Sequence, residues 1–160
     1  MPPDGTMDRP ITGFSLDEAG DWTATLNCGH QQHVRHKPPF ENRPWVTTPA
    51  GRESRMGAML NCVRCDSLEP PEPADVVGRT PEFTERTLPD ALRANHATAT
   101  GVWGRIVVSE GLVRYRVPAL GVDRDLEPGV PGIVVPEVRH SVEPRGAARL
   151  HVEFLRARAR

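Results

Sequence analysis

Two short runs of β-forming residues lie near the start of the chain, at residues 11–16 and 22–26. The polar stretch between them, DEAGD at residues 17–21, is rich in residues that form turns. Two such runs joined by a short turn are typical of a β-hairpin. We therefore expect a hairpin whose second strand leads directly to Cys28.

This hydrophobic pattern is lost over residues 31–45, which contain three prolines and Asn42. Proline fixes φ and has no backbone N–H, so the stretch predicts an ordered loop.

The next residues have the pattern of a short helix. Thr48 and Pro49 look like an N-cap followed by proline at the first helical position. Met56, Met59 and Leu60 then fall on one face at helical spacing. We expect a helix that packs on the hairpin through this face and leads into the next cysteine.

A proline-rich acidic stretch at residues 67–78 separates this part of the chain from the rest. Such a composition is typical of a linker. The sequence therefore predicts one domain at residues 1–66, a linker at residues 67–78 and a second domain at residues 79–160.

Short runs of strand-forming residues, separated by glycine and proline, recur after the predicted linker. They lie at residues 102–108, 112–117, 132–135, 140–142 and 149–155. Regularly spaced short strands favour an antiparallel sandwich or barrel. The predicted fold class is mainly β, with a small hairpin and helix module followed by an antiparallel barrel.

Length and charge narrow the function classes. The 160 residues carry a net charge of −1, so no overall field draws the protein to nucleic acid or to an anionic membrane. No apolar run approaches the roughly 20 residues that span a bilayer, and we expect a cytoplasmic protein. A module of fewer than about 70 residues usually needs a staple such as a metal ion.

The spacing of the cysteines and of one histidine indicates a metal site that could stabilise this module. Cys28 and His30 are separated by one residue, and Cys62 and Cys65 by two. A Cys-x-x-Cys turn directs both sulfurs at one ion, and a Cys-x-His pair completes the four-ligand shell that structural zinc prefers. All three cysteines of the chain are used, whereas a disulfide would leave one thiol over. The pattern predicts a zinc-stapled N-terminal module.

Two alternatives stay open at this point. Cys-x-x-Cys also marks thioredoxin-like redox sites, although these are expected in a βαβ neighbourhood that the pattern lacks. His30, His33 and His36 recur at every third position, and only one of them is needed. We choose His30 because it lies two residues from Cys28, whereas the other two would require the chain to fold back.

The loop after the first zinc ligands is a second candidate site. Arg35, His36 and Arg43 would lie close to the zinc, and together they could bind a small oxyanion or a phosphate. In the alternative interpretation the two arginines pair with acidic residues of the chain, and His33 supports a zinc ligand. The acidic candidates are Asp17, Glu18 and Glu41.

Both halves of the chain resemble known families. Residues 1–66, with the motifs ITGF, DEAGDW, CGHQQHVRH, NRPW and CxxC, resemble a bacterial zinc-knuckle domain family of unknown function, sometimes labelled pressure-regulated. Residues from about 80 to 155, with GVWGRIVV, VPEVRH and a late VEF, resemble the TehB/YeaR-like cupin family. The second resemblance implies a cupin-like double-stranded β-helix, a divalent metal and a link to tellurite or nitrosative stress. Neither family has an assigned reaction.

The cupin resemblance implies a second metal site. His96 and His140 occupy places that correspond to cupin ligands, and a carboxylate from Glu110 or Glu153 would complete a facial triad for iron, zinc or manganese. The sequence departs from the usual cupin pattern, since its first motif holds a single histidine. In the alternative interpretation both histidines are ordinary hydrogen-bonded residues.

These features favour a cytoplasmic metal-binding protein in which a zinc module is joined to a cupin domain that responds to tellurite, nitrosative or oxidative stress. A cupin metalloenzyme, an oxygenase or isomerase acting on a small molecule, is the first alternative. A regulator that contacts nucleic acid through its zinc knuckles is the second, and the net charge counts against it. An exposed barrel edge would permit a homodimer.

Overall fold

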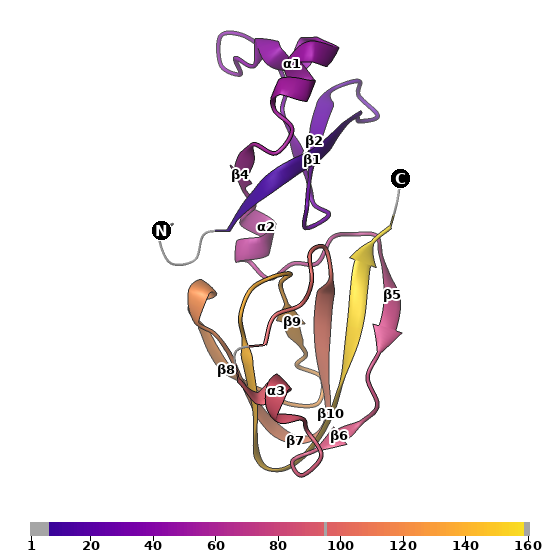
Figure 1. The fold of residues 1–160 in the computed structure, drawn as a ribbon, viewed down its shortest axis with the longest axis vertical. Coiled ribbons are helices and arrows are strands. Elements are labelled where there is room, and N and C mark those ends of the chain that lie inside the picture. Colours follow the sequence, from indigo (N-terminus) through magenta and orange to yellow (C-terminus); the bar gives the residue numbers. More distant parts are fainter. Residues whose placement is uncertain (1–6, 95, 159–160) are drawn as a thin grey trace.

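The computed structural model describes residues 7–94 and 96–158. Two β-sheets follow one another along the chain, as Figure 1 shows. We call residues 7–69 the N-terminal segment and residues 74–158 the C-terminal segment. The prediction of a mainly β protein, with a small first module and a second β-sheet domain, is confirmed.

The N-terminal sheet has the strand order β3-β2-β1-β4. The predicted hairpin is confirmed: β1 (Asp8–Leu16) pairs with β2 (Trp22–Leu26), and the Asp17 carboxylate accepts the Ala19 and Asp21 N–H groups at 2.9 Å in the turn. The start of the predicted loop forms strand β3, Gln31–His33. The hairpin therefore carries Cys28 into the turn between β2 and β3.

The helix predicted after Thr48 is shorter than expected. A 3-10 turn (η1, Pro44–Thr47) precedes α1 (Pro49–Ser54), and the Thr48 hydroxyl accepts the Gly51 N–H at 3.1 Å. The prediction that the helix continues along the methionine face is wrong. Residues Met59–Asn61 form strand β4, which pairs with β1. The positive φ of Gly57, +83°, interrupts the helical path, and pairing with β1 then fixes an extended chain.

The second sheet begins inside the predicted linker. Helix α2 (Val63–Asp66) is followed by a proline-rich connection, and β5 (Ala74–Arg79) then pairs antiparallel with β10. The prolines end at Pro73, after which β-forming valines can join a neighbouring strand. Only the first part of residues 67–78 therefore connects the two segments.

The C-terminal sheet has the order β5-β10-β7-β8 and is built on two long strands, β7 (Trp103–Val117) and β10 (Ser141–Ala157). Four of the predicted runs overlap these two strands, and two of them, 102–108 and 140–142, begin one residue before the strand does. The shorter elements are β6 (Phe83–Thr84), α3 (Asp90–Arg93), η2 (Pro118–Leu120), β8 (Val122–Leu126) and β9 (Gly132–Val134). Trp103, Tyr115, Ile106, Leu126 and Leu150 are among the side chains that fill its core.

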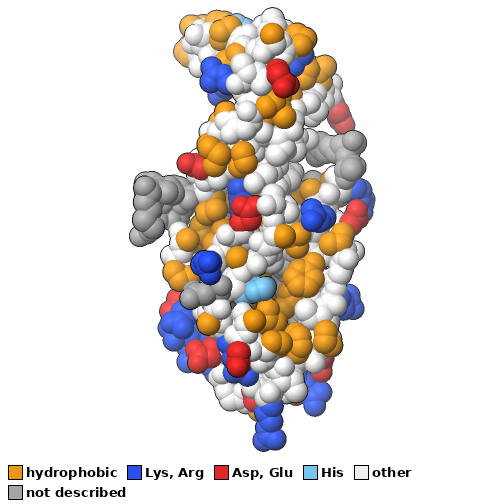
Figure 2. Space-filling view, viewed as in Figure 1, with side chains coloured by type: hydrophobic (Ala, Val, Ile, Leu, Met, Phe, Trp, Pro, Cys, Tyr) orange, Lys and Arg blue, Asp and Glu red, His pale blue; other side chains and the backbone are white. Residues whose placement is uncertain are grey.

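The face drawn in Figure 2 carries acidic and basic side chains interspersed over both segments rather than one basic patch. Arginine side chains pair with carboxylates along the C-terminal sheet, as Arg114 does with Asp123 at 2.8 Å and Arg145 with Asp125 at 2.6 Å. The opposite charges of these pairs offset each other along the strands.

Candidate metal centre

The turn between β2 and β3 presents Cys28 and His30 to the protein interior. The Leu26 N–H donates to the His30 carbonyl and the Gly29 N–H donates to the Leu26 carbonyl, both at 2.9 Å. This tight turn needs a positive φ at its tip, and Gly29 has a φ of +96°. The local sequence therefore directs both side chains to the same side.

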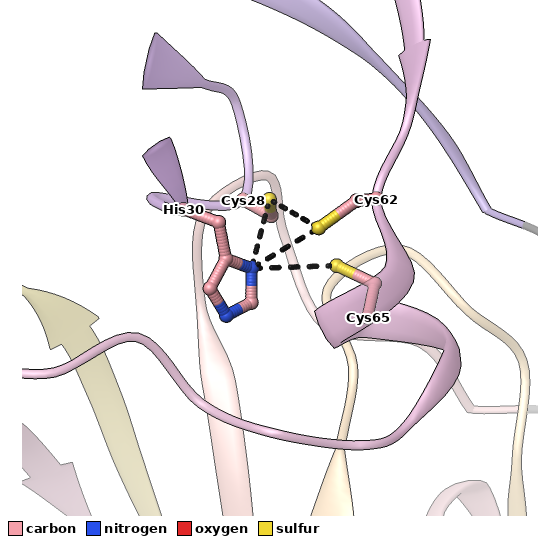
Figure 3. Close-up of side chains that lie close together, drawn as sticks. All are labelled: Cys28, His30, Cys62 and Cys65. Atoms are coloured by element: carbon pink, nitrogen blue, oxygen red, sulfur yellow. Dashed lines mark hydrogen bonds between the residues drawn. The ribbon is translucent and has the colours of Figure 1, made fainter. Parts of the chain in front are cut away.

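The other two cysteines lie at the N-cap of helix α2 and within the helix. Cys62 is the residue that precedes the first helical turn, and Cys65 lies within that turn. Their spacing therefore places the two sulfurs side by side, facing the β2–β3 turn (Figure 3).

The four candidate ligand atoms lie within 4.8 Å of one another, and all four residues are buried. His30 Nδ1 lies 3.3 Å from the sulfurs of Cys28 and Cys62 and 3.8 Å from that of Cys65. The sulfurs of Cys28 and Cys62 are 3.8 Å apart. A tetrahedral zinc centre separates two sulfurs by about 3.8 Å and a sulfur from a nitrogen by about 3.5 Å. The four atoms therefore fit the corners of one metal site (Figure 3).

Close packing of the four candidate ligands shifts the pKa values of three of them. Burial lowers the pKa of His30, but hydrogen bonds with the sulfurs of Cys28 and Cys62 outweigh it and raise this pKa to about 9. Hydrogen bonds with Cys28 and Cys65 lower the pKa of Cys62, whereas hydrogen bonds with Cys28 and Cys62 raise the pKa of Cys65. The protonation of the thiols and of the imidazole is therefore coupled within the cluster. A cation that displaces these protons would neutralise the thiolate charge.

The C-terminal segment contributes to the surroundings of this cluster. The indole N–H of Trp103 donates to the Cys28 carbonyl at 2.8 Å. The same ring lies edge-on to His30, with ring centroids 5.3 Å apart and an interplanar angle of 86°. Trp103 is fully buried. The sequence reasoning missed this role, because no local spacing connects Trp103 with residues far away in the chain.

The remaining histidines of the CGHQQHVRH motif lie outside the cluster. His33 is exposed and pairs with Asp17 at 3.1 Å, so it does not support a zinc ligand. His36 Nδ1 accepts the Arg43 backbone N–H at 2.9 Å. Among the described residues, the Cys28 cluster is the only group of three or more such side chains close enough to share an ion.

The predicted oxyanion site at Arg35, His36 and Arg43 is occupied by contacts within the protein. Arg35 pairs with Asp21 at 3.0 Å, and the Arg43 guanidinium donates to the Arg35 carbonyl at 3.1 Å. Pairing of Arg35 with an acidic residue agrees with the alternative interpretation, although the partner is Asp21 rather than the three residues considered.

The predicted second metal site is brought together only in part. His96 and His140 face each other across two backbone hydrogen bonds of 3.0 and 2.9 Å, with ring centroids 5.5 Å apart. They line a cavity of about 40 Å³ whose other walls are mostly apolar. Burial lowers the pKa of His140, which favours a neutral imidazole.

The two proposed carboxylates do not join these histidines. Glu110 is exposed and pairs with Arg149 at 3.4 Å. Glu153 pairs with Arg79 at 2.8 Å and with Arg105 at 3.3 Å. Val152 and Phe154 line the histidine cavity, so strand alternation turns Glu153 to the opposite face of the sheet. The expected triad with either glutamate is therefore wrong in this structure.

Family comparisons divide the chain in the same way as the two sheets. Residues 12–69 match the family described as Protein of unknown function (DUF3565), and residues 78–152 match the TehB-like domain. The first match lies within the N-terminal segment and the second within the C-terminal segment, and each covers less than half of the chain. The predicted resemblances to a family of unknown function and to TehB-like proteins are confirmed, and the cupin fold stays a prediction. The label "pressure-regulated" stays a prediction.

Two solved structures share a limited similarity with this chain. A protein from E. coli strain K12 is 21% identical, with a TM-score of 0.50, over 56% of this chain and 96% of that one. TehB from Haemophilus influenzae is 21% identical, with a TM-score of 0.48, over 52% of this chain. The match spans 32% of the TehB chain, or about a third of its length. No curated protein is detectably similar to this chain.

Proposed function

We propose that the protein is a zinc-binding protein in which Cys28, His30, Cys62 and Cys65 hold one structural zinc ion. The observation that carries the proposal is the convergence of these four buried donor atoms within 4.8 Å. Three thiolates and one imidazole are a preferred ligand set for structural zinc. Such a shell leaves no open position for substrate, so the zinc has a stabilising role rather than a catalytic one.

The test is the metal content of the purified full-length chain. We expect one zinc per chain in the wild type by elemental analysis. His30→Ala should lose high-affinity binding, because it removes one of four ligands. His33→Ala is the matched control, since His33 is an exposed histidine of the same motif that lies outside the cluster. Equal zinc content in wild type and His30→Ala would contradict the ligand assignment.

A second proposal concerns the C-terminal segment, which contains the TehB-like match and is called the TehB-like segment below. We infer that it has a cupin-type fold and takes part in the response to tellurite, nitrosative or oxidative stress through the cavity between His96 and His140. Support comes from the TehB-like match and from the two imidazoles that line a mostly apolar cavity. Pockets of this kind, apolar with a few convergent polar groups, are typical ligand sites.

This cavity could hold a divalent metal only if a third ligand comes from outside the pair, because Glu110 and Glu153 lie elsewhere. Metal analysis after loading with iron(II), zinc or manganese separates the alternatives. A second metal that His140→Ala removes would support a metal-binding cupin. If the wild type and His140→Ala both contain a single zinc, the cavity holds no metal. It would then be a site for a small organic or inorganic ligand that binds without a metal. An enzyme acting as an oxygenase would additionally consume oxygen in its iron-loaded form.

The proposed location is the cytoplasm, where reduced cysteines remain available to a metal. Within residues 7–94 and 96–158, no helix has the length and apolar character needed to cross a membrane. Fractionation of cells that produce the full chain tests the location. Recovery in the membrane or secreted fraction would contradict it.

A further inference from the structure

Trp103 belongs to the C-terminal, TehB-like segment, yet its side chain contacts the metal cluster of the N-terminal segment. It is the first residue of β7 and is fully buried. Its N–H donates to the Cys28 carbonyl at 2.8 Å, and its ring packs edge-on to His30 at 5.3 Å. One side chain therefore contacts two of the four candidate ligands.

These contacts restrain the ligands in two ways. The bond to the Cys28 carbonyl fixes the peptide group between Cys28 and Gly29, and so the direction in which the β2–β3 turn presents its ligands. A metal-binding histidine usually donates its second ring N–H to a neighbouring acceptor, which fixes the ring. His30 Nε2 is buried and has no such partner in the described part of the chain. Packing against Trp103 takes the place of that hydrogen bond.

A second contact seats the same turn on the C-terminal sheet. Gly29 approaches the end of β10 so closely that an added Cβ atom would lie 2.6 Å from the Cβ of Ala157. The turn is thus held between the start of β7 and the end of β10. Both contacts require the two segments to be docked.

We propose that Trp103 is a positioning residue of the metal site, and that the site reaches full affinity only when the TehB-like segment is docked on it. The proposal rests on the zinc function proposed above. Because coupling between binding and docking is reciprocal, zinc binding strengthens the junction between the segments by the same factor. The TehB-like segment therefore responds to whether the metal site is filled.

The first experiment compares zinc affinity in full-length wild type and Trp103→Phe by competition with a chromophoric chelator. Phenylalanine keeps a ring at the junction but has no N–H to donate to the Cys28 carbonyl. We expect a 10- to 100-fold loss of affinity, the usual effect of removing a group that orients a metal ligand. Trp22→Phe is the matched control. Trp22 lies under the Arg52 guanidinium, 3.9 Å from the ring centroid, and its variant should bind zinc like the wild type.

Cobalt in place of zinc gives a readout that general destabilisation would not move. The visible absorption of the Co²⁺-loaded chain reports the geometry of its ligands, and it should change in Trp103→Phe but not in Trp22→Phe. Wild-type affinity together with an unchanged cobalt spectrum in Trp103→Phe would overturn the positioning role. If the wild type itself binds no zinc, the proposed function fails as well, so the two failures are distinguishable.

A measurement on the unmutated chain covers the case in which Trp103→Phe does not fold. With ¹⁵N-labelled tryptophan, the Trp103 indole N–H should exchange slowly with solvent when zinc is bound. Its exchange should become at least about tenfold faster after chelation, because the hydrogen bond to Cys28 is lost. The Trp22→Phe and Trp45→Phe variants identify the remaining signal. Unchanged protection after chelation would overturn the coupling.

Discussion

The two segments are stabilised in different ways. The described part of the N-terminal segment buries only a few aliphatic side chains, and all three cysteines of the chain lie among its buried residues. The aliphatic ones are Ile11, Ala24, Leu26, Val34 and Val46. The C-terminal segment fills its core with Trp103, Tyr115 and a larger set of valines, leucines and isoleucine.

This difference shows that one chain can stabilise one segment with a metal site and the other with a hydrophobic core. Hydrophobic stabilisation grows with the apolar area removed from water, so a small module with few buried side chains remains marginal. A metal held by four residues adds stability without added length. The C-terminal sheet, with two strands of 15 and 17 residues, has enough apolar surface to do without one.

Removing the metal should have the largest effect, and beyond the contacts of Trp103 at the junction it should be confined to the N-terminal segment. A structural zinc contributes about 10–16 kcal/mol in zinc-finger peptides, which exceeds what the small N-terminal core can replace. After chelation, amides of β1 and β2 should lose protection from hydrogen exchange, while those of the inner part of β7 and β10 keep it. A chelated chain in which β1 and β2 remain protected would show that the N-terminal core is sufficient.

A cavity in the C-terminal core should have the next largest effect. Ile106 is 1% exposed, and Ile106→Ala should cost about 2–5 kcal/mol of unfolding free energy through lost burial and the space left behind. Denaturant unfolding of the zinc-loaded chain measures this change. Zinc content should stay at the wild-type value, because Ile106 is not a ligand. Loss of zinc in this variant would mean that the two segments depend on one core.

Gly29→Ala tests the turn that carries two ligands and touches both segments. Alanine at a φ of +96°, with its Cβ 2.6 Å from that of Ala157, strains the turn by about 1–3 kcal/mol. We expect weaker zinc binding and a lower melting temperature. Gly13→Ala is the control, since an added Cβ meets nothing within 4 Å there. Equal effects of both substitutions would argue against a special role for the turn.

The smallest expected effect is the acid sensitivity of His140. Burial lowers the pKa of this imidazole in the folded chain, so the unfolded chain binds the proton more readily. Stability should therefore fall as the pH drops below about 6.5, the ordinary histidine value. Nuclear magnetic resonance of the imidazole ring should show His140 titrating below this value, and His140→Gln should remove its share of the acid sensitivity. A titration at or above 6.5 would contradict the burial argument.

Local signals predicted local features well. The β1–β2 hairpin and the Thr48 cap follow from residues adjacent in sequence, and both form as expected. The helix expected through Met59 failed because pairing of β4 with β1 outweighs helical spacing over a few residues. The linker expected through residue 78 failed in its second part because β10 offers a partner to β5. Each failure comes from a strand whose partner lies far away in the chain.

The sequence by itself determined which atoms can meet at the metal site, since the short spacings of Cys28, His30, Cys62 and Cys65 restrict each pair to one turn. Only the tertiary structure decided what surrounds them. It placed Trp103 against two ligands and turned Glu153 away from the histidine cavity. The physical reason is that covalent spacing sets geometry within a turn. Contacts between segments depend instead on strand register and packing, which no local pattern encodes.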